Sequence, residues 1–231
     1  MVKPMHAATS LFEDDLAVRL MDRLIPLDGL GEGAVGRAEF GSAYFGRTVS
    51  ERTDFDLGPL PQGDMPDMLK PAAVLATIVR RPAGWTMLFT ERAADLPHHP
   101  GQVSFPGGRV QGEDAGPVAT ALREAEEELG VARGLFAPIG GLEPYVTGTG
   151  FRIMPVVAYL EPGFTLQPDP REVARVFEAP MSFLMDPARH EVREAEWRGA
   201  KRRFYAMPYE GHFIWGATAG MVRALYERLY S

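Results

Sequence analysis

The chain has 231 residues, of which 45% are hydrophobic and 24% are charged, so it has the composition of a folded protein and the length for one sizeable domain with appendages. Its formal net charge of −7 argues against nucleic acid as the main partner, because binding a phosphate backbone requires a broad basic face. The absence of cysteine excludes disulfides, zinc–thiolate sites and cysteine nucleophiles.

The N-terminal segment predicts a helix followed by an irregular arm. Residues 10–25 carry apolar side chains at helical spacing, with a capping box at Ser10 and Glu13 and a stop at Pro26. Residues 26–70 are rich in Gly, Pro and Asp, and we expect an arm, with room for one short helix, that wraps the main domain or a second subunit of a homodimer. Without a signal peptide or an apolar run of membrane-span length, we expect a cytoplasmic protein that does not bind membranes.

From residue 72 the sequence alternates between strand and helix patterns. We expect an N-terminal region over residues 1–70 and one domain over residues 71–231. Strands before and after a central helix predict an α/β sandwich around a mixed sheet. The expected strands are 72–81, 85–92, 135–143, 151–160, 201–206 and 212–215. The expected helices are 118–129 and 216–229. Within 171–186 we expect a short strand that runs into a helical turn.

The central helix carries the candidate chemistry. Glu124, Glu127 and Glu128 share an arc of about 100° on a helix of 3.6 residues per turn. Such a run of Glu is usually a solvated face, and its like charges cost roughly 0.2–0.5 kcal/mol per pair. A hard divalent cation would relieve that repulsion, and the glycines of Gly107-Gly108 let the backbone approach a ligand closely. This context favours a metal-bound diphosphate site.

The segment from Arg123 to Val131 resembles the second half of the Nudix box. The first half differs, because Asp114 stands where the box has Glu, and eight residues instead of seven separate it from Arg123. This spacing is similar to that of the coenzyme A diphosphatase branch, and the resemblance covers residues 72–231. Pro97 replaces a second Arg of the branch's upstream motif, a role that His98 or His99 could take. The other similar stretches are 88–93, 101–108, 145–152, 155–157 and 214–219.

The resemblance implies a Nudix-type α/β/α sandwich and Mg²⁺- or Mn²⁺-dependent hydrolysis of coenzyme A, or a derivative, to 3′,5′-ADP and 4′-phosphopantetheine. A different nucleotide substrate, such as ADP-ribose, NADH or another dinucleotide, stays open. So does a non-catalytic ligand-binding module, although the intact box argues against it. The implied metal ligands are Glu124, Glu128 and the carbonyl of Gly108, with Glu127 as a third ligand or as the base for water. The implied catalytic residues are Glu127, Glu128 and Arg123, and Gly107 and Gly108 contact the substrate. Arg92 either contacts a substrate phosphate or is a surface Arg at the end of a strand.

Four further features have competing interpretations. Tyr145 and Trp215 could stack on adenine, but aromatic side chains are more often part of the core. His98-His99 lacks a nearby third ligand for a metal. We expect the charged residues of 171–175 to form a solvated cluster.

Overall fold

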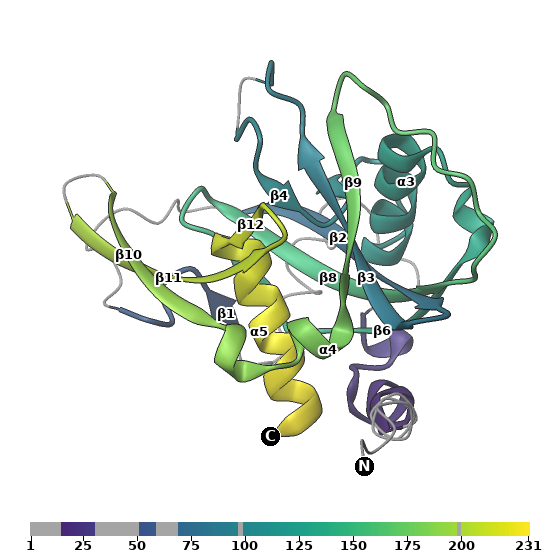
Figure 1. Cartoon of the computed structure of the whole chain (residues 1–231). Coiled ribbons are helices and arrows are strands. Elements are labelled where there is room, and N and C mark those ends of the chain that lie inside the picture. Colours follow the sequence, from purple (N-terminus) through teal and green to yellow (C-terminus); the bar gives the residue numbers. More distant parts are fainter. Residues whose placement is uncertain (1–14, 31–50, 59–68, 97–98, 198–199) are drawn as a thin grey trace, which may run out of the picture.

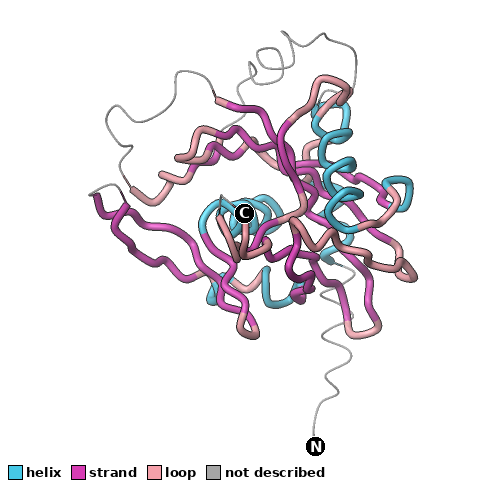
Figure 2. The backbone as a smooth tube through the Cα atoms, turned by 90° about the horizontal axis from the view of Figure 1, so that it is seen from above, coloured by secondary structure: helices cyan, strands magenta, loops and turns pink. Residues whose placement is uncertain are grey.

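The computed structural model describes residues 15–30, 51–58, 69–96, 99–197 and 200–231. These residues form a nine-stranded mixed sheet and a smaller three-stranded antiparallel sheet. Helix α3 (Pro117–Leu129) covers one face of the large sheet and α5 (Gly216–Tyr230) covers the other (Figures 1 and 2). The expected α/β/α sandwich with a mixed sheet is therefore confirmed.

The large sheet has the order β1-β7-β8-β2-β3-β4, with β5 paired to β2, β6 to β8 and β9 to β3. Its two longest strands run parallel at the centre, and β3 continues antiparallel to β2. The strands are β1 (Arg52–Thr53), β2 (Lys70–Arg81), β3 (Gly84–Arg92), β4 (Val103–Ser104), β5 (Gly107–Arg109), β6 (Phe136–Gly141), β7 (Tyr145–Val146), β8 (Phe151–Leu160) and β9 (Val173–Pro180).

The smaller sheet joins β10 (Glu191–Trp197), β11 (Ala200–Tyr209) and β12 (His212–Trp215) in a long hairpin and a short return (Figure 1). The sequence did not indicate β10, whose described side chains, residues 191–196, are all exposed and mostly charged. The remaining elements are short: α4 (Met181–Leu184), η1 (Leu27–Leu30), η2 (Arg133–Leu135) and η3 (Pro187–Arg189).

Strand β2 separates two hydrophobic cores. Because successive side chains of a strand point to opposite faces, Val74 and Ile78 pack in the core on the α5 side, whereas Ala73 and Leu75 pack in the core on the α3 side. Burial on both faces explains why the strand reads as a continuous apolar run in the sequence.

Helix α3 begins and ends where the sequence predicts. Pro117 occupies the first turn, where a missing backbone N–H costs nothing, and Gly130 ends the helix in the left-handed conformation with φ 65°. A β-carbon at Gly130 would overlap Gln167 of the loop that follows β8. The helix end and this loop are therefore packed backbone to backbone.

The first described segment is packed onto the body of the domain. Residues 15–23 are helical, and Leu16, Leu20 and Leu24 are buried in the core on the α5 side. Arg19 Nη1 donates a hydrogen bond of 3.0 Å to the Leu229 carbonyl. The helix ends at residue 23, three residues before Pro26, and Ile25 then bridges to Gly141 on β6.

The expected start of this helix at residue 10 lies outside the described residues, as do 31–50 and 59–68 of the expected arm. Within the rest of the arm, the structure shows the short helix η1 and strand β1. The division of the chain at residue 70 stays a prediction. Over the residues that the structure describes, no helix has the length and apolar character needed to cross a membrane.

Candidate active site

Two glycines give strand β5 close contacts, one with helix α3 and one with strand β2. Gly108 pairs with Ala73 of β2, and a β-carbon on Gly108 would lie 2.5 Å from the carboxyl group of Glu124. A β-carbon on Gly107 would lie 2.5 Å from the Ala73 carbonyl oxygen. Real β-carbons do not approach other atoms this closely, so neither position has room for a larger residue without movement of its neighbours.

Asp114 holds the arginine of the motif in place. Arg123 Nε and Nη2 donate to the two Asp114 carboxylate oxygens at 3.0 and 3.1 Å. Thr120 Oγ1 and the Gln111 backbone N–H donate to the same carboxylate at 2.9 and 2.8 Å. Burial alone would raise the pKa of Asp114, but these hydrogen bonds outweigh it and the pKa is lowered. The loop that departs from the Nudix box thus supplies an anchor for Arg123.

From this anchor, Arg123 reaches both neighbouring glutamates. Its Nη1 lies 2.9 Å from Glu124 Oε1 and 3.0 Å from Glu127 Oε2, and its Nη2 donates to the Arg109 carbonyl at 3.0 Å. The hydrogen bond to Asp114 raises the pKa of Arg123 further above its ordinary value. Arg123 therefore links the loop before the helix, strand β5 and the glutamate face.

Glu128 is the most deeply buried carboxylate of the site. The residue is only 4% exposed, and its Oε2 has no hydrogen-bond partner among the residues that the structure describes. Burial, and then the charge of Glu124, raise its pKa to about 8, although the Arg92 charge and the Gly107 backbone N–H favour the ionised form. Burial also raises the pKa of Glu124, against the opposing charge of Arg123.

Glu127 differs from the other two carboxylates. Its side chain is 55% exposed and is bound to Arg123, so it lies at the rim of the site. The fourth glutamate of the run, Glu126, pairs instead with Arg133. Over the described residues, no group of three or more His, Asp and Glu side chains is arranged to hold a metal. The assignment of all three glutamates as metal ligands stays a prediction.

Two residues from β3 and the β8–β9 loop complete the surroundings. Arg92 is half-buried at the end of β3, and its charge acts on Glu128, whereas its contact with substrate stays a prediction. The charge of Glu172 raises the pKa of both Glu124 and Glu128. Two backbone hydrogen bonds hold Glu172 near these glutamates. Ala93 N–H donates to the Glu172 carbonyl, and Asp169 N–H donates to the Glu128 carbonyl.

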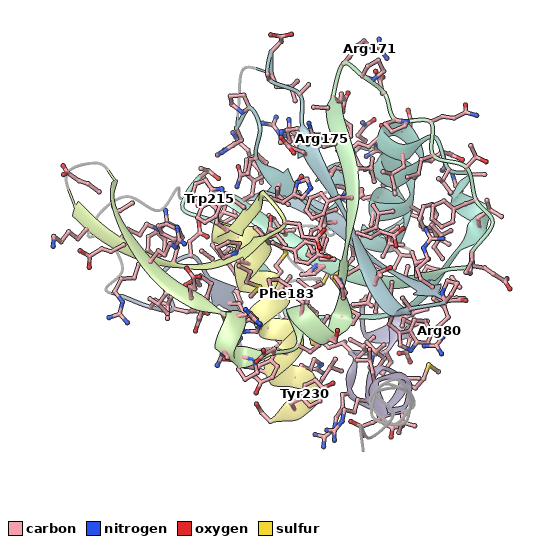
Figure 3. The ribbon with its side chains drawn as sticks, in the orientation of Figure 1. Arg80, Arg171, Arg175, Phe183, Trp215 and Tyr230 are labelled. Carbon is pink, nitrogen blue, oxygen red and sulfur yellow. The ribbon has the colours of Figure 1, made fainter. Side chains whose placement is uncertain are left out.

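The sequence predicts Glu172 only as part of a solvated cluster. Exposure of Arg171, Glu172 and Arg175 agrees with that interpretation, and Figure 3 shows Arg171 and Arg175 at one end of the molecule. What the sequence does not show is the pairing of β9 with β3, which carries this loop to the end of α3.

The remaining candidates lie elsewhere or outside the described residues. Tyr145 is buried and donates a hydrogen bond of 3.1 Å to Asp54, so it is a core residue in this structure. Trp215 is half-buried among Phe204 and Phe213. His99 is exposed with φ 56°, whereas Pro97 and His98 lie outside the described residues.

A family model described as the NUDIX domain matches residues 69–202. The chain belongs to the Nudix family. It is a hydrolase that acts on a nucleoside diphosphate derivative.

Relatives and solved structures carry the same family name. A protein of Photorhabdus laumondii described as the uncharacterized Nudix hydrolase NudL is 37% identical over 171 residues, which cover 74% of this chain and 91% of that protein. The protein of the same description from Escherichia coli K12 is 41% identical over 154 residues, covering 67% and 80%. The crystal structure of the Nudix hydrolase RenU from M. smegmatis is 23% identical, with a TM-score of 0.43 and coverage of 51% of this chain and 74% of that one.

Nudix hydrolases generally use divalent metal ions, and two observations show that this chain's residues suit one. Glu128 Oε2 is a buried carboxylate oxygen to which no described residue donates a hydrogen bond, and a hard cation would satisfy it. The missing β-carbon of Gly108 leaves its backbone beside the Glu124 carboxyl group. Carboxylate and carbonyl oxygens are the ligands that Mg²⁺ prefers, with water and substrate phosphate as its other ligands.

Proposed function

We propose that this Nudix hydrolase cleaves the diphosphate bond of coenzyme A, or of a derivative, to 3′,5′-ADP and 4′-phosphopantetheine. The observation that carries the proposal is the pair formed by half-buried Glu124 and buried Glu128 beside the Gly107-Gly108 strand. The choice of coenzyme A is supported by the longer loop typical of that branch, in which Asp114 binds Arg123 through two hydrogen bonds.

Each residue of the site then has a chemical role. Glu124, Glu128 and the Gly108 carbonyl would hold Mg²⁺ or Mn²⁺, which when bound neutralises the diphosphate and acidifies a water. Arg123 orients Glu124 and Glu127 through its two ion pairs. Glu127, at the solvent-exposed rim, accepts at Oε1 or Oε2 the proton that the attacking water loses. Arg92 offers positive charge to the departing phosphate.

The first experiment is a competition assay analysed by mass spectrometry. Purified protein is incubated with Mg²⁺ or Mn²⁺ and equal amounts of coenzyme A, ADP-ribose, NADH and a diadenosine polyphosphate. We expect selective appearance of 3′,5′-ADP and 4′-phosphopantetheine. Selective cleavage of a different compound would overturn the choice of substrate but leave the glutamate site intact. Metal-dependent binding without cleavage of any compound would instead indicate a ligand-binding module.

We also propose that the protein is cytoplasmic and that it forms a homodimer. Sedimentation analysis of the purified chain over a range of concentrations tests the dimer directly, because a dimer that forms reversibly dissociates on dilution.

A further inference from the structure

Two cations converge on one aromatic ring at the end of the sheet where β2 begins. Lys70 Nζ lies 5.7 Å from the centroid of the Phe151 ring, and the guanidinium carbon of Arg109 lies 5.3 Å from the same centroid. Both cationic residues are exposed. Within the part of the chain that the structure describes, neither cation has a carboxylate partner.

Strand register builds this cluster, so it does not depend on flexible loops. Lys70 is paired with Phe151 across the parallel β2–β8 ladder, and its backbone N–H donates to the Gly150 carbonyl at 2.8 Å. Arg109 is paired with Ala72, two residues along β2 from Lys70. Because side chains alternate along a strand, all three side chains lie on the α5 face of the sheet, the face to which Val74 belongs.

The cluster also adjoins the diphosphate site. Gly108 faces Glu124 on the α3 side of the sheet, and Arg109 is the next residue, about 3.8 Å away between α-carbons. The Arg109 carbonyl is itself fixed by Arg123. A substrate whose diphosphate lies at Glu124 and which extends over the end of β5 therefore meets Arg109 and Lys70 on the other face.

A phosphate monoester is the ligand that suits these two side chains. One cation is enough for an attractive contact with an aromatic ring. Two cations at the same ring repel each other unless an anion lies between them. A phosphate monoester carries roughly −1.5 to −2 charges at pH 7, which two cations neutralise. Arg binds phosphate through two parallel hydrogen bonds and Lys binds it as a compact point charge.

We infer that Lys70 and Arg109, beside Phe151, bind a phosphate monoester of the substrate that is separate from the diphosphate being cleaved. This inference rests on the proposed function and deepens it. Coenzyme A carries a phosphate monoester on its ribose, whereas ADP-ribose and NADH carry none. The cluster thus gives the enzyme a physical means to select coenzyme A from the other nucleotides.

The test compares coenzyme A with dephospho-coenzyme A, which lacks only that phosphate. The double variant Lys70→Gln, Arg109→Gln should raise the KM for coenzyme A about 10-fold or more and leave kcat unchanged, because two charged contacts to the ground state and transition state are lost alike. Its KM for dephospho-coenzyme A should stay at the wild-type value.

The matched control is Arg80→Gln. Arg80 lies near the other end of β2 (labelled in Figure 3), and its guanidinium carbon is 5.1 Å from the centroid of the Trp85 ring. This variant therefore also removes a cation from an aromatic ring. We expect it to leave both KM values unchanged. An equal change for both substrates in the double variant, or no change for either, would overturn the inference.

A binding measurement separates this inference from the proposed function. Calorimetric titration of 3′,5′-ADP and of 5′-AMP into the wild type should show tighter binding of 3′,5′-ADP, and the double variant should lose that preference. If the wild type cleaves neither form of coenzyme A, the proposed function fails, and this titration still decides the phosphate site. Equal affinities of the wild type for the two nucleotides would refute it.

Discussion

Glu128 combines deep burial with an oxygen that has no hydrogen-bond partner in the described part of the chain. Leaving a buried polar group unpaired costs about 1–3 kcal/mol, so a bound cation has both a chemical and an energetic reason to occupy this position. Exchange of Glu128 for Gln keeps the shape of the side chain and removes its charge.

We predict that Glu128→Gln lowers turnover by more than the roughly 100-fold that marks the upper range for residues behind metal ligands. The matched control is Glu126→Gln, since Glu126 lies on the same helix but pairs with Arg133. Steady-state kinetics at saturating Mg²⁺ measure both. Near-normal turnover in the Glu128 variant would contradict the proposed role of the glutamate face.

The same residue predicts a pH dependence of folding in metal-free protein. Burial raises the pKa of Glu128 from 4.5 to about 8, so the folded state holds a proton that the unfolded state has released over this range. The free energy of unfolding contributed by Glu128 is therefore greatest below pH 4.5 and decreases as the pH rises toward 8. Urea unfolding in the presence of a chelator measures it. The wild type should lose stability relative to Glu128→Gln across this range, and parallel pH profiles would refute the prediction.

Gly108 offers a way to disturb the site without disturbing the fold. In Gly108→Ala, the new methyl group displaces the Glu124 carboxyl group, which is the end of a flexible side chain. We expect turnover to fall about 100-fold or more, because a displacement of about 1 Å can cost that much, while the melting temperature changes little. Gly134→Ala is the control, since a β-carbon there would meet no atom of the described residues within 4 Å. Retained activity in Gly108→Ala would show that the Gly108–Glu124 approach is not needed.

Among the elements, the loop between β5 and α3 has a defined task. It brings Asp114, whose side chain is 5% exposed, to Arg123, and it thereby fixes the orientation of the glutamate face. The loop and the helix act as one unit because the Thr120 hydroxyl within α3 also binds Asp114.

We predict that Asp114→Asn reduces turnover roughly 10–100-fold, as is typical of residues that orient metal ligands. It should also lower the free energy of unfolding by about 1.5–3 kcal/mol, because charge-assisted hydrogen bonds to Arg123 are weakened. Kinetics and urea unfolding measure the two effects, with the neighbouring exposed residue changed in Glu113→Gln as the control. An unaltered turnover would show that Arg123 keeps its position without the loop.

Periodicity explains which elements were predictable. Helix α3 and its carboxylates follow from a 3.6-residue pattern with Pro and Gly at its ends, and β2 follows from a long apolar run. The described side chains of strand β10 are all exposed and mostly charged. The strand therefore has no alternation of apolar and polar residues that would reveal it in the sequence. The anchoring role of Asp114 depends on how a loop folds back, and the position of Glu172 depends on the long-range pairing of β9 with β3. Neither leaves a local pattern.

At the scale of the whole molecule, the N-terminal helix belongs to the core although it lies far from the glutamate site. Leu16 and Leu20 are buried on the α5 side of the sheet, whereas the glutamates lie on the α3 side. Stability and chemistry should therefore respond separately to changes in this helix.

We predict that Leu20→Ala lowers the free energy of unfolding by about 2–5 kcal/mol, the usual cost of a cavity in a core. Turnover per folded molecule at low temperature should remain that of the wild type. The exposed residue Val18 on the same helix supplies the control, Val18→Ala. Thermal unfolding and kinetics together test this, and a stable but inactive Leu20 variant would show that the helix contributes to the site.

The hydrogen bond from Arg19 to the Leu229 carbonyl spans 210 positions in the chain. During synthesis, Leu229 is added to the chain 210 positions after Arg19. At roughly 5–20 residues per second, synthesis of the chain from Arg19 to Leu229 takes about 10 to 40 s. The contact between Arg19 and Leu229 therefore forms only after the strands of both sheets have been made.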